Sequence, residues 1–427
     1  MDPRAELMVR YAGAFWPEVI TRASGSWLET ADGRRVLDFT SGQLCATVGH
    51  SHPHVTEAIE RSLRETVHLN SRMLSTPVLD LAETLVGLMP EGLDRVMLLS
   101  TGGEANEAAL RMAKLATGGF EVLGLTRSWH GMTMGSQAVT YAAARRGHGP
   151  LAPGAFALPA PYAYRCPIRH CSDTCDTTCL EVGFEQFDEQ TTGAPAAVIA
   201  EPVLSAGGVI VPPPGYFARL AGLARDRGMP VFLDEAQTGF GRLGVMFGFE
   251  LFDFQPEFVT LSKSLGGGLP ISAVVTTAEI EQAAYDKGLF YFTSHQSDPL
   301  PAAAGLAVLD VVRDEGLVAK ARERGERLGG HLRELQKRHE AIGDVRGLGL
   351  LWGVEFVRDR ETREPASEFG DAVTAACEKA GLCMNIVRSQ SGPMSACARV
   401  APPLTVSDDE IDTAAEILDD ALRRTKL

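Results

Sequence analysis

The sequence predicts an α/β fold with a large domain built on a central, mainly parallel sheet and a smaller α+β domain. The chain has 427 residues, 45% of them hydrophobic, which is enough for a large core, and chains of this size commonly divide into two domains. The middle of the chain alternates short apolar runs with amphipathic stretches, the pattern of βαβ units. After about residue 300, long charged amphipathic stretches indicate the second domain.

Four short apolar runs are the clearest candidate strands. They are residues 95–100, 197–200, 230–233 and 258–261. Each run ends in polar or Gly-rich residues. Because open α/β sheets bind ligands beyond the carboxyl ends of their strands, we expect functional side chains at these four ends.

The C-terminal part is predicted from its helical periodicity. Residues 313–340 are expected to be helical, and the apolar run 348–356 follows them. The last helix has a start signal, because Ser407 and Glu410 form a possible capping box. One apolar face follows it, formed by Ile411, Ala414, Ala415, Leu418 and Leu422.

Charge and hydropathy exclude several classes of protein. The formal net charge of −15 argues against a nucleic-acid partner, which requires a basic surface. The first residues carry charges throughout, and no stretch approaches about 18 uninterrupted apolar residues. We therefore expect a cytoplasmic protein with no membrane partner that acts on small molecules.

Four of the eight cysteines cluster at Cys166, Cys171, Cys175 and Cys179, beside His170. Such residues can bind zinc or form disulfides, although this spacing is not one of the common zinc signatures. We favour a surface insertion of free or partly bridged thiols.

The segment LLSTGGEANEAALRMAK has the features of an anion-binding turn. A strand is expected to end at Ser100, and a helix to begin at Gly102 and Gly103, with Thr101 and Glu104 as a capping box. Glycines at a helix N-terminus let an anion approach bare backbone N–H groups, and the helix dipole favours negative charge. An ordinary tight βα turn would have the same pattern.

Side chains that can take part in catalysis follow two further predicted strands. Asp234, in LDEAQTGFGR, could pair with a protonated heterocyclic nitrogen, cap a helix or bind a metal. Lys263, in LSKSLGGGLP, could form a Schiff base if burial lowers its pKa, although most lysines only solvate a surface. Together with the Gly turn, these residues favour a pyridoxal phosphate enzyme.

Over essentially its whole length the sequence resembles the class III (ω-type) aminotransferases of pyridoxal phosphate fold type I, the aspartate aminotransferase-like fold. The matching segments are LDFTSGQ, STGGEANEAALRMAK, SWHGMT, IAEPVLSAGG, LDEAQTGFGR, LSKSLGGGLP, SDPLPAA, GDVRGLGLLWGVE and RVAPPLTVSDDEID. The resemblance implies a large domain at 53–312, a small domain at 313–427, and an N-terminal segment, 1–52, packed on the small domain. It also implies pyridoxal 5′-phosphate as cofactor and a homodimer or dimer-of-dimers with shared active sites.

The resemblance assigns roles to individual residues. Lys263 is expected to carry the cofactor as a Schiff base and to shuttle the proton. The other expected contacts are Asp234 with the ring nitrogen, Gln237 with the ring oxygen, Trp129 with the ring face, Gly102 and Gly103 with the phosphate, and Ser294 with the phosphate of the neighbouring subunit.

The choice of reaction depends on how the substrate carboxylate is held. Arg399 matches the carboxylate-binding arginine of the family. Gln43, Met132 and Asn385 match the 2,2-dialkylglycine decarboxylases, in which such a glutamine contacts the carboxylate that leaves as CO2. The expected reaction converts a 2,2-dialkylglycine and pyruvate to a ketone, CO2 and L-alanine. Conventional transamination to a 2-oxo acid, racemisation, and a non-catalytic structural or ligand-sensing role are the alternatives.

The same resemblance implies an alkali-metal site for K⁺ or Na⁺. Its expected ligands are Leu69, Ser71, Ser294, Gln296 and Asp298. Oxygen ligands suit such hard cations. Ser294 and Gln296 stand where the pattern has threonine and valine, which leaves the ion preference open.

Overall fold

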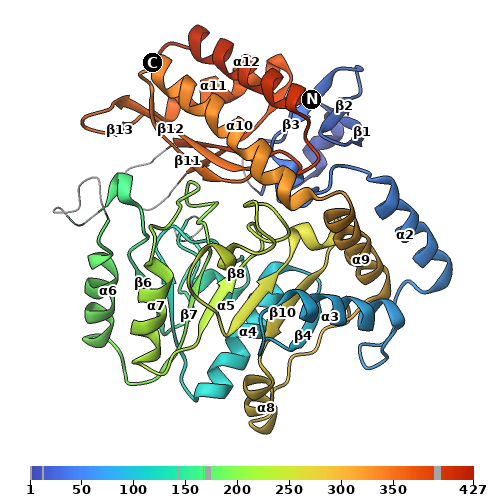
Figure 1. The fold of residues 1–427 in the computed structure, drawn as a ribbon, viewed down its shortest axis with the longest axis vertical. Coiled ribbons are helices and arrows are strands. Elements are labelled where there is room, and N and C mark those ends of the chain that lie inside the picture. Colours follow the sequence, from blue (N-terminus) through green and yellow to red (C-terminus); the bar gives the residue numbers. More distant parts are fainter. Residues whose placement is uncertain are drawn as a thin grey trace.

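The computed structural model describes residues 2–11, 14–142, 145, 147–166, 168, 175–388 and 396–427. It has a lower α/β layer around a large sheet and an upper layer formed by the C-terminal helices and a second sheet (Figure 1). The predicted α/β fold is confirmed.

The large sheet has seven strands in the order β4-β10-β9-β8-β7-β5-β6. Neighbours from β9 to β6 pair in parallel, whereas β10 is antiparallel to both β4 and β9. The strands are β4 (Arg95–Leu99), β5 (Glu121–Leu125), β6 (Ala155–Leu158), β7 (Pro195–Ala200), β8 (Val231–Asp234), β9 (Phe258–Leu261) and β10 (Ser272–Thr276). The four strands expected from the sequence coincide with β4, β7, β8 and β9.

Helices cover the large sheet. They are α2 (Pro53–Glu65), α3 (Thr76–Leu88), α4 (Gly102–Thr117), α5 (Met134–Ala138), α6 (Thr178–Asp188), α7 (Tyr216–Arg225), α8 (Ala278–Asp286) and α9 (Pro299–Asp314). Helix α4 packs on β7, β9 and β10, and its alanine-rich face is buried there. Short 3-10 turns stand at η1 (Pro3–Leu7), η2 (Ala163–Arg165), η3 (Gly248–Leu251) and η4 (Lys263–Gly266).

The second sheet has the order β11-β12-β16-β15, and β13 pairs with β12. Its strands are β11 (Ile342–Leu348), β12 (Leu351–Asp359), β13 (Glu364–Pro365), β15 (Asn385–Arg388) and β16 (Ala396–Val400). It packs with α10 (Leu317–Arg338) and α11 (Ser367–Ala380), and α12 (Asp408–Arg424) packs on these two helices. The capping box of Ser407 and Glu410 forms at the start of α12.

The expected helix over 313–340 is divided. Residues Arg313 and Asp314 end α9, and α10 begins only at Leu317. Gly316 separates the two helices with a φ of 62°, a left-handed conformation in which a right-handed helix cannot continue.

The N-terminal part joins the C-terminal layer. Strands β1 (Ile20–Ser24), β2 (Trp27–Thr30) and β3 (Arg35–Asp38) form a sheet whose last member is β14 (Leu382–Cys383), parallel to β3. Leu37 and Phe39 share a buried core with residues of α10, α11 and α12. The boundaries of the domains at residues 52 and 312 stay a prediction.

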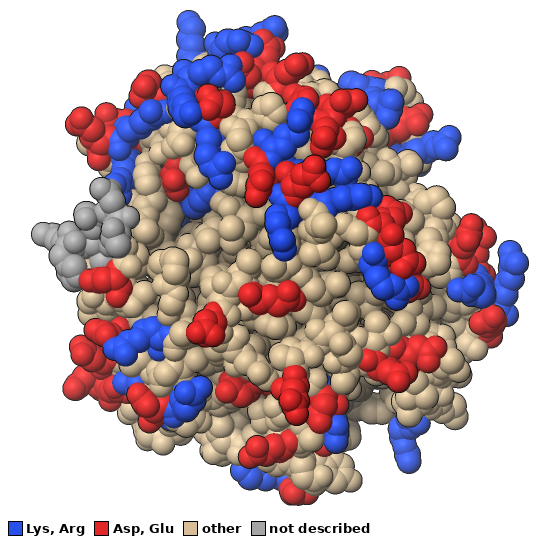
Figure 2. Space-filling view, viewed as in Figure 1, with Lys and Arg blue, Asp and Glu red and all other residues tan. Residues whose placement is uncertain are grey.

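The surface carries both signs of charge. On the face in Figure 2, Lys and Arg side chains alternate with Asp and Glu side chains and no large basic patch is visible. None of the helices in the described parts of the chain is long and apolar enough to cross a membrane.

Candidate active site

A cavity of about 340 Å³ opens beyond the carboxyl ends of β4, β8 and β9. The structure brings together there, from separate parts of the chain, the predicted cofactor residues Gly102, Gly103, Trp129, Asp234 and Lys263. Asn106, His130 and Cys45 also line the cavity. This is the position at which open α/β sheets bind ligands.

Asp234 is the last residue of β8 and is held by hydrogen bonds. Its Oδ2 accepts from Asn106 Nδ2 at 2.8 Å and faces His130 Nδ1 at 2.9 Å, and its Oδ1 accepts from the backbone N–H of Ala236 at 3.1 Å. Burial alone would raise the pKa of this carboxyl, but His130 and Lys263 hold the pKa below its usual value. Asp234 is therefore an anion fixed at the cavity.

Lys263 follows β9 and begins η4 with a φ of 44°. Burial lowers the pKa of its amine, while the charge of Asp234 opposes that effect. A lysine with a lowered pKa is more often neutral, and the neutral amine is the nucleophile in Schiff-base chemistry. The side chain lines the cavity, as this chemistry requires.

Gly102, at the start of α4, and Gly131, beside Gly103, leave room where a side chain would not fit. A Cβ on Gly102 would lie 2.7 Å from Ser262 Oγ, and a Cβ on Gly131 would lie 2.9 Å from the Cα of Gly103. The Thr101 and Glu104 capping box forms as expected. Bare backbone N–H groups at a helix N-terminus suit a phosphate, so the residues present fit pyridoxal phosphate.

Glu201 is a site residue that the sequence reasoning missed. Its Oε1 accepts a hydrogen bond from the backbone N–H of Trp129 at 2.8 Å. Burial and the charge of Asp234 raise the pKa of Glu201 to about 8. The sequence could have indicated Glu201 by its position directly after β7, because the other predicted site residues also follow strand ends.

A second cluster surrounds the guanidinium of Arg399. This residue lies on β16 opposite Asn385 of β15, and its side chain is 5% exposed. Its Nη1 donates to Gln237 Oε1 at 2.9 Å and its Nη2 to Gln43 Oε1 at 3.2 Å. Burial lowers the pKa of Arg399 to about 10 despite the charge of Glu201, so the guanidinium stays cationic at neutral pH.

Gln43 accepts a second hydrogen bond, from Asn385 Nδ2 at 3.2 Å. It belongs to α1 (Ser41–Leu44), a turn in which all four residues have a positive φ, between 47° and 65°. Left-handed helical conformation costs an L-residue other than glycine roughly 1–2 kcal/mol. The turn that carries Gln43 is therefore strained, and the surrounding structure must hold it.

Met132 and Ser294, predicted to contact the substrate and the neighbouring subunit's cofactor, do not line the cavity within one chain. Met132 has a side chain 47% exposed to solvent and is not among the residues that line the cavity. Ser294 is exposed, and its expected partner belongs to a neighbouring subunit. Their roles stay predictions.

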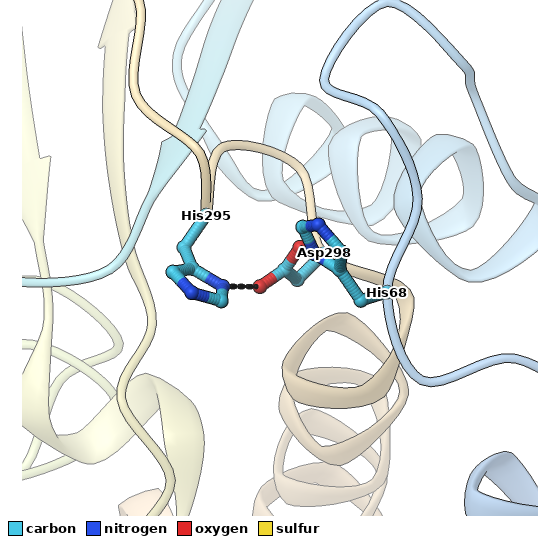
Figure 3. A group of neighbouring side chains, drawn as sticks. All are labelled: His68, His295 and Asp298. Atoms are coloured by element: carbon cyan, nitrogen blue, oxygen red, sulfur yellow. Dashed lines mark hydrogen bonds and ion pairs between the residues drawn. The ribbon is translucent and has the colours of Figure 1, made fainter.

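The residues expected to bind an alkali metal lie on two neighbouring loops. Ser71 Oγ donates to the Thr293 carbonyl at 2.8 Å. The carboxylate of Asp298, however, is shared by two histidines, with His68 Nδ1 at 2.6 Å and His295 Nδ1 at 2.7 Å (Figure 3). Leu69 is half-buried, and Gln296 lines a separate cavity of about 320 Å³. The alkali-metal site stays a prediction, and the sequence reasoning missed the two histidines.

Part of the cysteine cluster lies outside the described residues, namely Cys171 and His170. Of the remainder, Cys179 is buried on α6, and Cys166 and Cys175 are half-buried.

Comparison with known proteins places the chain in a family. The family model for class III aminotransferases matches residues 11–422. The chain is 46% identical to an uncharacterized aminotransferase of Schizosaccharomyces pombe, over 98% of this chain and 93% of the relative. It is 33% identical to a probable 4-aminobutyrate aminotransferase of Bacillus subtilis, over 94% and 92%.

A solved structure shows the same fold. It is an amine transaminase from an uncultivated Pseudomonas species in its PLP-bound form. The two chains share 30% identity and a TM-score of 0.89, and 98% of this chain and 99% of the other are covered. The protein belongs to the class III aminotransferase family and is a pyridoxal phosphate-dependent enzyme of fold type I.

Proposed function

We propose that this aminotransferase is a decarboxylating transaminase that takes the amino group from a 2,2-dialkylglycine and passes it to pyruvate or a similar 2-oxo acid. The observation that carries the proposal is the placement of Gln43. Its side-chain oxygen accepts hydrogen bonds from both Arg399 and Asn385. The two N–H bonds of its amide therefore point away from these donors and are available to a substrate carboxylate.

Pyridoxal phosphate, when bound, supplies an electron sink for the bond that breaks at the substrate carbon. We infer that the N–H groups of Gly102 and Gly103 hold its phosphate and that the Asp234 carboxylate holds its ring nitrogen. Trp129 would cover one face of the ring. Asn106 and His130 keep the Asp234 carboxylate in place through its Oδ2.

The substrate carboxylate has two candidate partners. Arg399 is a buried cation with a planar pair of donors, the geometry that binds a carboxylate in a bidentate manner. The neutral amide of Gln43 lies beside it and stabilises a negative charge less strongly. A carboxylate at Gln43 is therefore freer to leave as CO2 than one held by Arg399. Lys263 can take up a proton from the ammonium group of the incoming substrate and return it after CO2 has left, because its lowered pKa lets the amine both accept and release a proton.

Conventional transamination is the second candidate, and the relatives named aminotransferases favour it. It requires an amino acid with a hydrogen on its α-carbon, which Lys263 would remove. Arg399 alone is sufficient to bind the carboxylate in this reaction.

The test uses 2-aminoisobutyrate, which has no hydrogen on its α-carbon and can therefore donate its amino group only by losing CO2. We expect the holoenzyme with pyruvate to release acetone, CO2 and L-alanine in equal amounts. Gln43→Ala should lower kcat/KM by roughly 10²-fold, the usual cost of losing one positioned donor. L-alanine with a 2-oxo acid is the control donor, and its turnover should be less affected. Turnover of that donor without any turnover of 2-aminoisobutyrate or other dialkylglycines would contradict the proposal.

A further inference from the structure

The turn Ser41–Leu44 is held from three directions. At its start, Asp38 of β3 accepts from the backbone N–H of Thr40 at 2.9 Å and from the backbone N–H of Gly42 at 2.8 Å. At its end, the Leu44 carbonyl accepts from Thr47 Oγ1 at 3.2 Å and from Ser264 Oγ at 3.2 Å. Ser264 directly follows Lys263, so the turn is connected to the Schiff-base segment.

The third attachment is the guanidinium of Arg242, whose side chain is fully buried. Its Nη2 donates to Ser41 Oγ at 3.4 Å, and its Nη1 donates to the Pro402 carbonyl. Ser41 Oγ in turn donates to the Ala401 carbonyl. The turn is thus attached to the loop that follows β16, the strand that carries Arg399.

Asp38 is the central element of this arrangement. Its side chain is buried, and both oxygens of its carboxylate are used. The Oδ1 accepts from the N–H and the hydroxyl of Thr40. The Oδ2 accepts from Gly42 N–H and faces His50 Nε2 at 2.8 Å. One carboxylate therefore satisfies the N–H of Thr40, just before the left-handed turn, and the N–H of Gly42 within it.

We propose that Asp38 is a positioning residue for the reaction: by holding the left-handed turn, it keeps the Gln43 amide beside Arg399, where the substrate carboxylate binds. This inference rests on the proposed role of Gln43 and extends it. Without the carboxylate, the turn relaxes toward ordinary backbone angles, and the Gln43 side chain leaves Arg399. Asp38 itself lies behind the turn and contacts no reacting atom.

The test is a double-mutant cycle in the holoenzyme. In Asp38→Asn the amide cannot accept from Thr40 and Gly42 at once, because one of its two positions carries hydrogens. We expect kcat/KM for the amino donor to fall by roughly 10²-fold, the scale of a misplaced catalytic group. In a Gln43→Ala background the same substitution should cost less than about twofold, because the group that Asp38 positions is already gone.

Asp419→Asn is the matched control. Asp419 is also a buried carboxylate that faces a histidine, with His339 Nε2 at 2.6 Å, but it lies on α12. Its loss should lower thermal stability without changing kcat/KM. Gly42→Ala is a second variant in case Asp38→Asn does not fold. A Cβ at this residue, with its φ of 54°, would lie 3.3 Å from His50 Cε1, so the substitution should also displace the turn. The fall in kcat/KM that it causes should again vanish in the Gln43→Ala background.

The outcomes separate the two proposals. If Asp38→Asn lowers kcat/KM equally with and without Gln43, its role is only structural and the positioning proposal is wrong, whatever the reaction. If the effects of the two substitutions are non-additive but no CO2 is released, the positioning proposal holds and the proposed decarboxylation is wrong. If Gln43→Ala alone changes nothing, the role proposed for Gln43 and the positioning role of Asp38 are both overturned, and the release of CO2 from 2-aminoisobutyrate still decides the reaction.

Discussion

Asp234 and Glu235 are adjacent buried carboxylates with different surroundings. Asp234 ends β8 and lines the cavity. Glu235 points elsewhere, where it accepts from the backbone N–H of Phe249 at 2.9 Å and from Thr238. Burial raises the pKa of Glu235 to about 7, whereas His130 holds the pKa of Asp234 below its usual value despite burial. The hydrogen bonds from His130 and Asn106 and the nearby Lys263 thus make Asp234 a fixed anion.

We expect Asp234→Asn to lower kcat by at least about 10²-fold, because an amide carries no charge to pair with a protonated ring nitrogen. The measurement is single-turnover kinetics with the absorbance of the bound cofactor. Glu235→Gln is the control and should keep both the absorbance and the rate. Equal losses in the two variants would show that Asp234 acts only through the local fold.

Single residues were predictable where they follow a strand. Asp234 and Lys263 stand at strand ends, and the structure places both at one cavity. Glu201 and Asn106 were missed because their importance comes from partners far along the chain, Trp129 and Asp234 respectively. His68 was missed for the same reason, because its partner Asp298 is 230 residues away.

At the scale of elements, α4 and α12 begin with the same type of N-terminal cap. Thr101 caps α4 and Ser407 caps α12, each in a complete capping box. Both were predictable, because a capping box depends only on residues three apart in the sequence. The turn Ser41–Leu44 was not, because its left-handed backbone depends on Asp38 of β3 and on Arg242 and Ser264, which come from the segments after β8 and β9.

The two caps permit a matched prediction. We expect Thr101→Ala and Ser407→Ala each to lower the free energy of unfolding by about 1 kcal/mol, measured by urea denaturation of the cofactor-free protein. Only Thr101→Ala should also raise the Kd for pyridoxal phosphate, because its helix begins at the proposed phosphate-binding residues Gly102 and Gly103. A similar change of Kd in Ser407→Ala would mean that cofactor affinity reports overall stability rather than these two residues.

At the scale of the molecule, a buried ion cluster joins the two layers. Glu355 of β12 is 0% exposed. It pairs with Arg346 of β11 at 2.8 Å and with Arg165, which comes from η2 after β6, at 2.5 Å. Arg346 also donates to the Gly208 carbonyl of the large layer at 2.9 Å. This connection was not predictable from the sequence, because its members are separated by up to 190 residues.

We expect Glu355→Gln to lower the free energy of unfolding at pH 7 by about 3 kcal/mol, because Arg165 loses its carboxylate partner and Arg346 keeps only Asp344. Burial raises the pKa of Glu355, but Arg346 and Arg165 bring the pKa below its ordinary value. The unfolded chain has a glutamate pKa of about 4.3, so the stabilisation is complete above that pH and is lost as the pH falls through the lower pKa of the folded protein.

The measurement is therefore urea denaturation of wild type and Glu355→Gln between neutral and acid pH. The difference in unfolding free energy should be constant above about pH 5 and shrink below about pH 4, where the unfolded state binds the proton. Asp412→Asn is the control, because its pair with Arg327 is partly exposed and should contribute less than about 1 kcal/mol. A difference that stayed constant into acid would mean that Glu355 stabilises the two layers by packing alone, and that its charge does not join them.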